Sequence, residues 1–333
     1  MKYNHFRGLM RIIKCIFSTL AFILILPIGI PTARADYAEA VALYNRGEYK
    51  KAIQELQPDL ENNRDWEFGH RLLGLCYLNL NNNALAASSL SRAVELRSTS
   101  FSTYFGLAQA YFNMQKYGDC ITALNKGEPI AAKDTNPEAS QSKLYRLRGS
   151  SYYRLNNFKE TIEDLTRALR LSDANWTDFT MLGISYYNTT RIDEAIESLE
   201  KSLALNPNQQ AIKGILGNAY LEKGTDALSK KQFQNAVKLF NKAGEYDSRN
   251  GYVYYNLAES YLFEKKYSSA EEALKKAMNL MPQNENVLER LGLVYEKMKK
   301  WDLALETYQK ARNLKPSKSL NDAIERVKNN SSQ

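Results

Sequence analysis

The chain has 333 residues, of which 44% are hydrophobic and 25% are charged, and these ordinary proportions exclude global disorder. Its net charge is +8, but residues 1–35 hold five basic and no acidic side chains, which leaves 40 basic and 37 acidic residues in the remainder. That balance excludes the concentrated basic face typical of nucleic-acid binding, so no nucleic-acid partner is predicted.

The first predicted element is a secretory signal peptide at residues 1–35. A basic stretch precedes an apolar run from Cys15 to Ile30, and Ala33 and Ala35 stand at the two small positions of a cleavage site. The run is short and contains a proline, Pro27, which disfavours a helix that crosses a membrane. We therefore expect cleavage after Ala35, export, and no membrane span afterwards. The alternative is an uncleaved N-terminal anchor.

A repeated pattern fills the rest of the chain. Each unit carries Gly or Ala, then Tyr three residues later and Ala nine residues after that, and several units end at Pro. The small residues let two antiparallel helices approach closely, Tyr fills the space beside the crossing, and Pro ends the second helix. Clear examples are Gly183, Tyr186, Ala195 and Pro207; Ala258, Tyr261, Ala270 and Pro282; and Gly292, Tyr295, Ala304 and Pro316.

These residues resemble the tetratricopeptide repeat family, and the resemblance covers nearly all of residues 36–330 on one 34-residue frame. It implies an all-α fold, a right-handed α-solenoid of about eight antiparallel helix hairpins with a C-terminal capping helix, in which stacking supplies the core. The predicted repeats lie near 36–66, 67–100, 101–141, 142–175, 176–209, 210–250, 251–284 and 285–318, and the capping helix at 319–330.

Two segments depart from this frame. Seven residues are inserted within residues 126–138, where two prolines predict a surface loop. The sixth repeat has seven extra residues inside its first helix, between Leu216 and Phe233. Because seven residues are close to two helical turns, the apolar face keeps its phase. We therefore predict an elongated first helix that protrudes from the solenoid.

Residues suited to catalysis are scarce. After residue 35 the chain has one histidine, His70, and two cysteines, Cys76 and Cys120, too few for a zinc site built from these side chains. No phosphate-binding Gly-rich loop or nucleophile motif occurs. We predict no enzymatic activity, no catalytic residue, no metal and no cofactor. Whether the two cysteines form a disulfide or lie buried as small apolar residues stays open.

The resemblance places a binding surface on the concave face, which the first helices of the repeats line. The residues that it assigns to this groove, and that we predict to bind a partner, are Tyr44, Asn45, Arg71, Asn79, Phe112, Asn113, Arg146, Tyr153, Arg154, Tyr187 and Asn188. Asn recurs at one position, where a row of amides suits the backbone of an extended peptide. Asn is also a common C-terminal helix cap, and both interpretations stay open.

Charge divides the same face. Its middle is basic, with Arg71, Lys143, Arg146 and Arg154, and its far end is acidic, with Glu222, Glu259, Glu289 and Glu296. A basic cluster fits a carboxylate or an acidic segment of a partner. The alternative is scattered charge that is simply solvated.

We predict from these features a non-enzymatic scaffold or adaptor that holds an extended peptide or partner protein in its groove. The resemblance to exported members of the family implies a bacterial cell envelope and a periplasmic location. Two alternatives remain. One is a carbohydrate-binding component of polysaccharide export, with Tyr and Phe side chains stacked on sugar rings. The other is self-association, in which the basic middle of one chain meets the acidic end of another.

Overall fold

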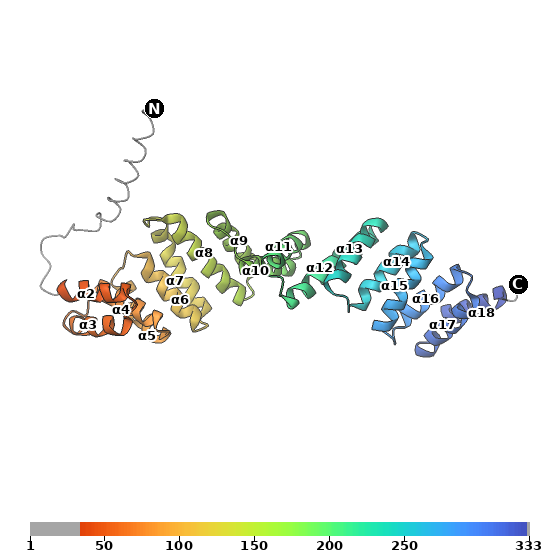
Figure 1. The fold of residues 1–333 in the computed structure, drawn as a ribbon, viewed down its shortest axis with the longest axis horizontal. Coiled ribbons are helices and arrows are strands. Elements are labelled where there is room, and N and C mark those ends of the chain that lie inside the picture. The colour runs from red at the N-terminus through yellow and green to blue at the C-terminus, as the bar shows by residue number, and fades with distance from the viewer. Residues whose placement is uncertain (1–33, 332–333) are drawn as a thin grey trace, which may run out of the picture. The chain divides into compact units, whose positions relative to one another are not determined.

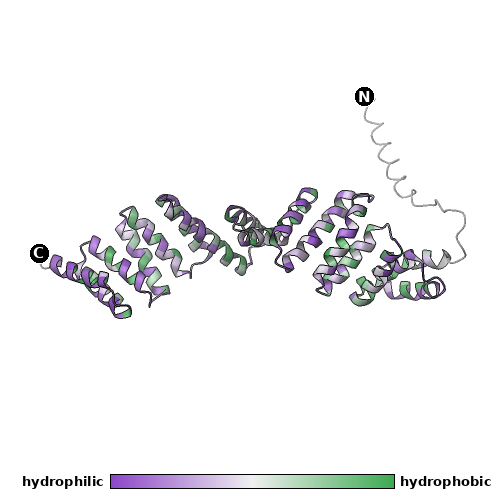
Figure 2. Cartoon of the chain, turned by 180° about the vertical axis from the view of Figure 1, so that it is seen from behind, coloured by the Kyte–Doolittle hydropathy of each residue, from purple (hydrophilic) through white to green (hydrophobic). Residues whose placement is uncertain are grey.

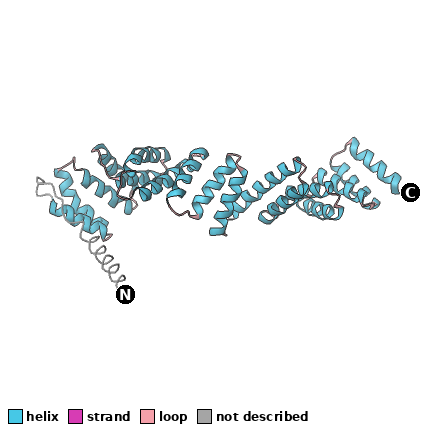
Figure 3. Ribbon diagram, turned by 90° about the horizontal axis from the view of Figure 1, so that it is seen from above, coloured by secondary structure: helices cyan, strands magenta, loops and turns pink. Residues whose placement is uncertain are grey.

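The computed structural model describes residues 34–331, so the predicted signal peptide lies almost wholly outside the described residues. Within that range every element of regular secondary structure is an α-helix (Figure 3). The described chain divides between Thr99 and Ser100 into two compact units. A search of the described helices finds none with the length and apolar character needed to span a bilayer.

The first unit contains two helix hairpins. They are α2 (Arg34–Asn45) with α3 (Tyr49–Asn62), and α4 (Glu67–Asn79) with α5 (Asn83–Glu95) (Figure 1). The core of the unit is built from small and branched apolar side chains that the repeat pattern predicts, among them Ala40, Ala52, Leu56 and Leu72. Cys76 is fully buried in the same core.

The second unit contains six hairpins and one further helix. The hairpins are α6 (Phe101–Asn113) with α7 (Tyr117–Ala131), α8 (Pro137–Arg154) with α9 (Phe158–Leu171), α10 (Trp176–Asn188) with α11 (Ile192–Leu205), α12 (Gln210–Ser229) with α13 (Phe233–Tyr246), α14 (Gly251–Phe263) with α15 (Tyr267–Leu280), and α16 (Glu285–Lys297) with α17 (Trp301–Leu314). The last helix, α18 (Lys318–Ser331), packs on α17 through four buried apolar residues. The predicted all-α fold of stacked helix hairpins is confirmed.

Within each unit every helix packs against the next one in the chain. Each helix carries both hydrophobic and hydrophilic residues (Figure 2), so one side can be buried while the other stays in water. The crossing within a hairpin requires a small residue, which is Gly in some hairpins and Ala in others, such as Ala108 and Ala258. A Cβ atom on Gly183 would lie 2.5 Å from Cδ2 of Leu199 on the partner helix, a distance that real contacts do not reach. Ala195 beside this crossing is fully buried.

The turn inside each hairpin has one conformation throughout. The residue two positions after the end of the first helix has a positive φ in all eight turns: Gly47, Asn81, Gln115, Asn156, Thr190, Lys231, Lys265 and Lys299. In the α12–α13 turn, for example, the Lys231 N–H donates to the Leu228 carbonyl and the Gln232 N–H to the Ala227 carbonyl. This is the Schellman arrangement, which satisfies the last carbonyls of a helix. Seven of the eight turns hold a side chain in the left-handed region, where glycine is normally preferred.

The predicted surface loop at residues 126–138 is mostly helical, so that prediction was wrong. Helix α7 continues through Pro129 to Ala131, and α8 begins at Pro137. Pro137 occupies the first turn of α8, where its missing N–H has no helical partner to lose, and the Asn136 side chain caps the helix by accepting the Ala139 N–H. Pro129 lies near the end of α7, where few hydrogen bonds follow it. Both prolines are thus compatible with helix.

The sixth hairpin does contain a long first helix, since α12 runs unbroken for 20 residues. It does not protrude, however, and that part of the prediction was wrong. Ile212 and Leu216 in its first half are buried in a cluster with Ile196 and Leu199 of α11. Ala227 in its second half is buried in the core that α13 to α18 share. Both halves of α12 are therefore covered by neighbouring helices.

The frame of this hairpin is also displaced from the predicted one. A Cβ atom on Gly224 would lie 2.6 Å from the Phe240 ring, sixteen residues further on. Gly183 and Leu199 have the same spacing and the same close approach. Gly217 and Tyr220 have the Gly–Tyr spacing of the repeat pattern, which predicts the crossing at Gly217. The crossing residue is instead Gly224, and the seven extra residues precede it.

Candidate partner-binding surface

The first helices of successive hairpins pack side by side. The contacts join α2 to α4 in the first unit, and α6 to α8, α8 to α10, α10 to α12 and α12 to α14 in the second. No two second helices of the described chain share contacts of comparable extent. Successive first helices therefore form a continuous face over α2 and α4 in the first unit and from α6 to α14 in the second, which we call the first-helix face. The predicted groove residues belong to it.

In the first unit, the structure brings together two predicted residues, Tyr44 and Asn79. The Asn79 amide donates to the Tyr44 hydroxyl at 3.4 Å and to the Leu75 carbonyl at 2.8 Å. The Tyr44 ring also packs edge-on against Tyr49 at 5.4 Å, and burial raises the pKa of its hydroxyl. Asn45, the last residue of α2, is exposed.

Arg71 is not a free cation. Its Nε lies 3.6 Å from Oε1 of Glu67, one helical turn earlier, and its guanidinium stacks over the Phe68 ring at 5.1 Å. Phe68 itself is 54% exposed. The outward-facing feature here is thus an aromatic ring with a cation above it.

In the second unit, Arg146 is engaged within the chain. Its Nε pairs with Asp178 at 2.9 Å, and its guanidinium also bonds to the Asp173 carbonyl. Asp178 is buried and closes the capping box of α10 with Asn175. Arg146 therefore joins α8 to the start of α10, and its charge is paired inside the chain. Arg154, the last residue of α8, is exposed and makes no ion pair within residues 34–331.

The predicted aromatic residues of the second unit are half-buried. Phe112 packs edge-on against Tyr117 at 5.4 Å, and Tyr153 packs in the same way against Phe158 at 6.3 Å. In both pairs the second ring begins the second helix of the hairpin, so these aromatics help to close the turn. Burial raises the pKa of Tyr153.

The Tyr187 hydroxyl donates to Glu222 on the next first helix. Burial and this carboxylate together raise the pKa of Tyr187 to about 12. The hydrogen bond ties α10 to α12 across the first-helix face.

The recurring asparagines occupy one structural position. Asn45, Asn79, Asn113 and Asn188 are the last residues of α2, α4, α6 and α10. The Asn79 and Asn188 amides each donate at 2.8 Å to the carbonyl four residues earlier, so both cap their own helix. An amide that donates one bond still has an acceptor oxygen. The capping interpretation thus holds for these two, and it leaves a hydrogen-bond acceptor for a ligand.

Two of the four acidic residues predicted at the far end are paired with arginines. Glu259 binds Arg290 at 3.0 Å, and Glu296 binds Arg326 at 2.7 Å. Burial raises the pKa of Glu259, whereas the Arg326 guanidinium lowers the pKa of Glu296. The charges of these two residues are thus satisfied inside the chain, which weakens the case for self-association between a basic middle and an acidic end.

The sequence reasoning missed a buried ion pair in the fourth hairpin. Arg148, 6% exposed, makes two bonds to Asp164 at 2.7 and 2.9 Å, and further bonds to Glu128 and Asn125, each at 2.7 Å. Burial opposes its charge, but the carboxylates of Asp164 and Glu128 outweigh it and raise the pKa of Arg148. A signal was present: Arg148 stands before Gly149, where most other units have Leu.

The two cysteines are free, buried and located in different units. Burial raises the pKa of Cys76 to about 12 and that of Cys120 to about 11, so both behave as small apolar side chains. Among residues 34–331 no group of three metal-ligating side chains lies together. His70 bonds to the Arg64 carbonyl at 2.9 Å.

The stacked hairpins and their common turn define a helix-hairpin repeat protein. Two family models match the chain: the tetratricopeptide repeat over residues 178–209, and the model described as anaphase-promoting complex, cyclosome, subunit 3 over residues 229–311. These matches support the predicted resemblance to the tetratricopeptide repeat family. A search of the curated proteins gives no match.

Several solved structures are similar to this chain. The C-terminal part of a TPR repeat-containing protein from Cytophaga hutchinsonii is 17% identical, with 77% of this chain and 99% of that one covered and a TM-score of 0.44. YrrB, described as a TPR protein with an unusual peptide-binding site, is 21% identical over 61% of this chain and 97% of that one, with a TM-score of 0.42. The TPR2AB domain of yeast Sti1 in complex with pHSP90 is 19% identical, with 80% of this chain and 98% of that one covered and a TM-score of 0.42.

Proposed function

We propose that this chain is a non-enzymatic scaffold that binds an extended segment of a partner protein along its first-helix face. The observation that carries the proposal is the exposure of large aromatic side chains on that face. Phe68 in the first unit, and Tyr252 and Phe263 in the second, are 54%, 58% and 59% exposed. Aromatic rings give large apolar contacts at a low entropy cost, which favours binding.

The positions of these three aromatics support the same surface. Phe68 and Tyr252 are equivalent residues near the start of α4 and α14, and Phe263 ends α14 at the place where other first helices have Asn. The exposed rings therefore extend the surface into the seventh hairpin, beyond the first five repeats on which the sequence-based site is centred. Hydrogen-bonding groups on the same face, such as the exposed Asn188 amide, suit a peptide backbone.

The test is a selection of peptides from a random library on the full chain after residue 35, followed by affinity measurements. We expect Tyr252→Ser combined with Phe263→Ser to weaken the selected peptides at least tenfold. The matched control replaces Leu205 and Leu314, which are 57% and 47% exposed on second helices, by Ser. Equal losses in both variants, or glycan binding without any selected peptide, would refute the proposal.

We further propose that the scaffold is exported to a bacterial cell envelope. This rests on the basic stretch, the apolar run and the small residues Ala33 and Ala35 in the sequence. A reporter that is active only outside the cytoplasm, fused after Ala35, tests it directly. Export of the fusion supports the proposal, and a cytoplasmic fusion product contradicts it.

A further inference from the structure

Positive charge gathers at the last three hairpin turns of the second unit. Lys231, Lys265 and Lys299 hold the same left-handed position in the α12–α13, α14–α15 and α16–α17 turns, and all three are exposed. The equivalent residues of the five earlier turns are uncharged: Gly47, Asn81, Gln115, Asn156 and Thr190. Because the hairpins stack in order, these lysines form a row along one edge of the unit, which we call the lysine edge.

A second lysine is adjacent in sequence to each of these three, and it forms an ion pair with a nearby acidic residue. Lys230 pairs with Asp226 at 2.7 Å, Lys266 with Glu264 at 3.0 Å, and Lys300 with Glu271 at 2.7 Å. Lys231, Lys265 and Lys299 themselves make no ion pair within residues 34–331. The three central ammonium groups of the lysine edge are thus available to an external anion.

Aromatic surface borders the same edge. The Phe233 ring, at the start of α13, stacks on Phe263 with 4.7 Å between centroids and 9° between planes. This stack places the sixth and seventh turns next to one another, and it leaves Phe263 59% exposed. The lysine edge therefore adjoins the first-helix face at Phe263.

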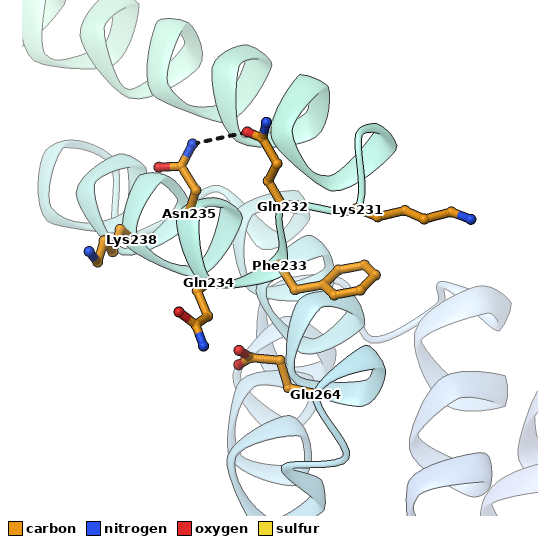
Figure 4. A pocket seen from close by; sticks show the side chains of 7 residues that line it. All are labelled: Lys231, Gln232, Phe233, Gln234, Asn235, Lys238 and Glu264. Carbon is orange, nitrogen blue, oxygen red and sulfur yellow. Dashed lines mark hydrogen bonds between the residues drawn. The ribbon is translucent and has the colours of Figure 1, made fainter.

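A shallow depression lies between the two turns (Figure 4). Its lining combines two lysines, three side-chain amides, one aromatic ring and one carboxylate: Lys231, Lys238, Gln232, Gln234, Asn235, Phe233 and Glu264. The amides both donate and accept hydrogen bonds, as a peptide backbone requires. The lysines are compact charges that hold carboxylates without the planar geometry of arginine.

The neighbouring surface decides between classes of anion. Glu264 belongs to the wall of the depression, has only 11% of its side chain exposed and is paired with Lys266, so it adds little net negative charge. The lysine edge adjoins the first-helix face at Phe263, so the expected anion rests on the proposed function: it is a further part of the same polypeptide partner, whose backbone the amides of the depression can bind. We propose that the lysine edge is a second docking surface, which binds an acidic, extended segment of a partner protein.

The test uses a fluorescein-labelled peptide of four Asp-Glu-Phe repeats and the full chain after residue 35, with binding followed by fluorescence anisotropy. We expect Lys231→Gln, Lys265→Gln and Lys299→Gln together to weaken binding roughly tenfold at low ionic strength, because three exposed charge contacts are lost. The matched control changes Lys126, Lys133 and Lys159 to Gln. It removes the same net charge from exposed lysines of other hairpins in the unit, and we expect less than a twofold effect.

Circular dichroism establishes that both triple variants keep the helical fold. An equal loss in the control variant overturns the proposal, because net charge alone would then explain binding. Equal affinity for a peptide of Asn-Gln-Phe repeats overturns it as well. Tighter, lysine-edge-dependent binding of anionic phospholipid vesicles or of a single-stranded oligonucleotide overturns the assignment to an acidic peptide.

Discussion

The fourth and fifth hairpins place different side chains beside the same helix crossing: a charged pair in the fourth and an uncharged pair in the fifth. In the fifth, Leu182 and Ser198 stand beside the close approach of α10 and α11, and both are buried. In the fourth, the equivalent residues of α8 and α9 are Arg148 and Asp164, which are buried as fully and form a bidentate ion pair. One backbone arrangement thus accommodates either an uncharged pair or a charged one.

The difference shows what the repeat pattern does and does not specify. The pattern fixes where helices approach, because the crossing requires small residues at set positions. The pattern does not specify whether the side chains beside the crossing are apolar or charged, because a buried charge is tolerated there when it has partners. Helix α7 of the preceding hairpin supplies two of those partners, since Asn125 and Glu128 both accept from Arg148. The charged crossing of the fourth hairpin is therefore completed by the third hairpin.

The strongest way to break the fourth hairpin is to remove one half of its ion pair. We expect Arg148→Ala to lower the free energy of unfolding by about 3–5 kcal/mol, because Asp164 would be left buried without a counter-charge. Urea denaturation followed by circular dichroism measures the loss. Hydrogen exchange of α8 and α9 amides locates it. A loss below about 1 kcal/mol would mean that the network does not hold the two helices together.

Giving the fourth hairpin the two crossing residues of the fifth tests the effect of the buried charges on stability. Arg148→Leu combined with Asp164→Ser gives the fourth hairpin the residues of the fifth. We expect unfolding free energy unchanged or raised by about 1–4 kcal/mol, because the cost of burying two charges disappears. The single variant Arg148→Leu is the control, and it should destabilise the chain as Arg148→Ala does. A destabilised double variant would show that Glu128 and Asn125 need Arg148 for the path of α7.

The same two hairpins explain how much of the structure was readable from sequence. The hairpins themselves were predictable, since Gly183, Tyr186 and Ala195 report a helix crossing through size alone. The ion pair between Arg148 and Asp164 was not, because its partners lie 16 residues apart on different helices. When only the sequence is known, a charged residue whose partner cannot be identified is predicted to be exposed to solvent.

The candidate site shows the same limit. Arg146 was predicted to face a ligand, but its partner Asp178 lies 32 residues further on and belongs to the cap of the next hairpin. The extent of helix was also ambiguous. Pro129 and Pro137 favour a loop by composition, yet Pro137 stands in the first turn of α8, which tolerates proline, and α7 continues for two residues beyond Pro129.

Glycine substitutions sharpen the comparison at the crossing itself. A Cβ on Gly183 would lie 2.5 and 2.6 Å from two atoms of Leu199, whereas a Cβ on Gly149 would lie 3.0 and 3.1 Å from Leu165. We expect Gly183→Ala to destabilise by about 1–2 kcal/mol, since crowding outweighs the gain in helix propensity. Gly149→Ala should change stability by less than about 1 kcal/mol, because the two effects nearly cancel there. Equal urea midpoints for both variants would contradict the difference in packing.

The smallest effect expected concerns Tyr153 and Tyr187, which are equivalent residues of the two hairpins. Only Tyr187 donates to a carboxylate, that of Glu222 on α12. We expect Tyr187→Phe to cost about 1 kcal/mol at neutral pH through the loss of this hydrogen bond. Tyr153→Phe should stay within about 0.5 kcal/mol, as is usual for a substitution without a lost partner.

The pH dependence of stability distinguishes the hydrogen bond from packing. The folded pKa of Tyr187, about 12, exceeds the ordinary value of 10.0, so the folded chain holds this proton more tightly than the unfolded chain does. Its contribution is complete below about pH 10 and is lost as the pH rises through about 12. The tyrosinate absorbance that Tyr187→Phe removes, measured as the difference between the two titration curves, should therefore appear near pH 12. If this difference appears near pH 10 instead, Glu222 does not hold the hydroxyl, and the link between α10 and α12 rests on packing alone.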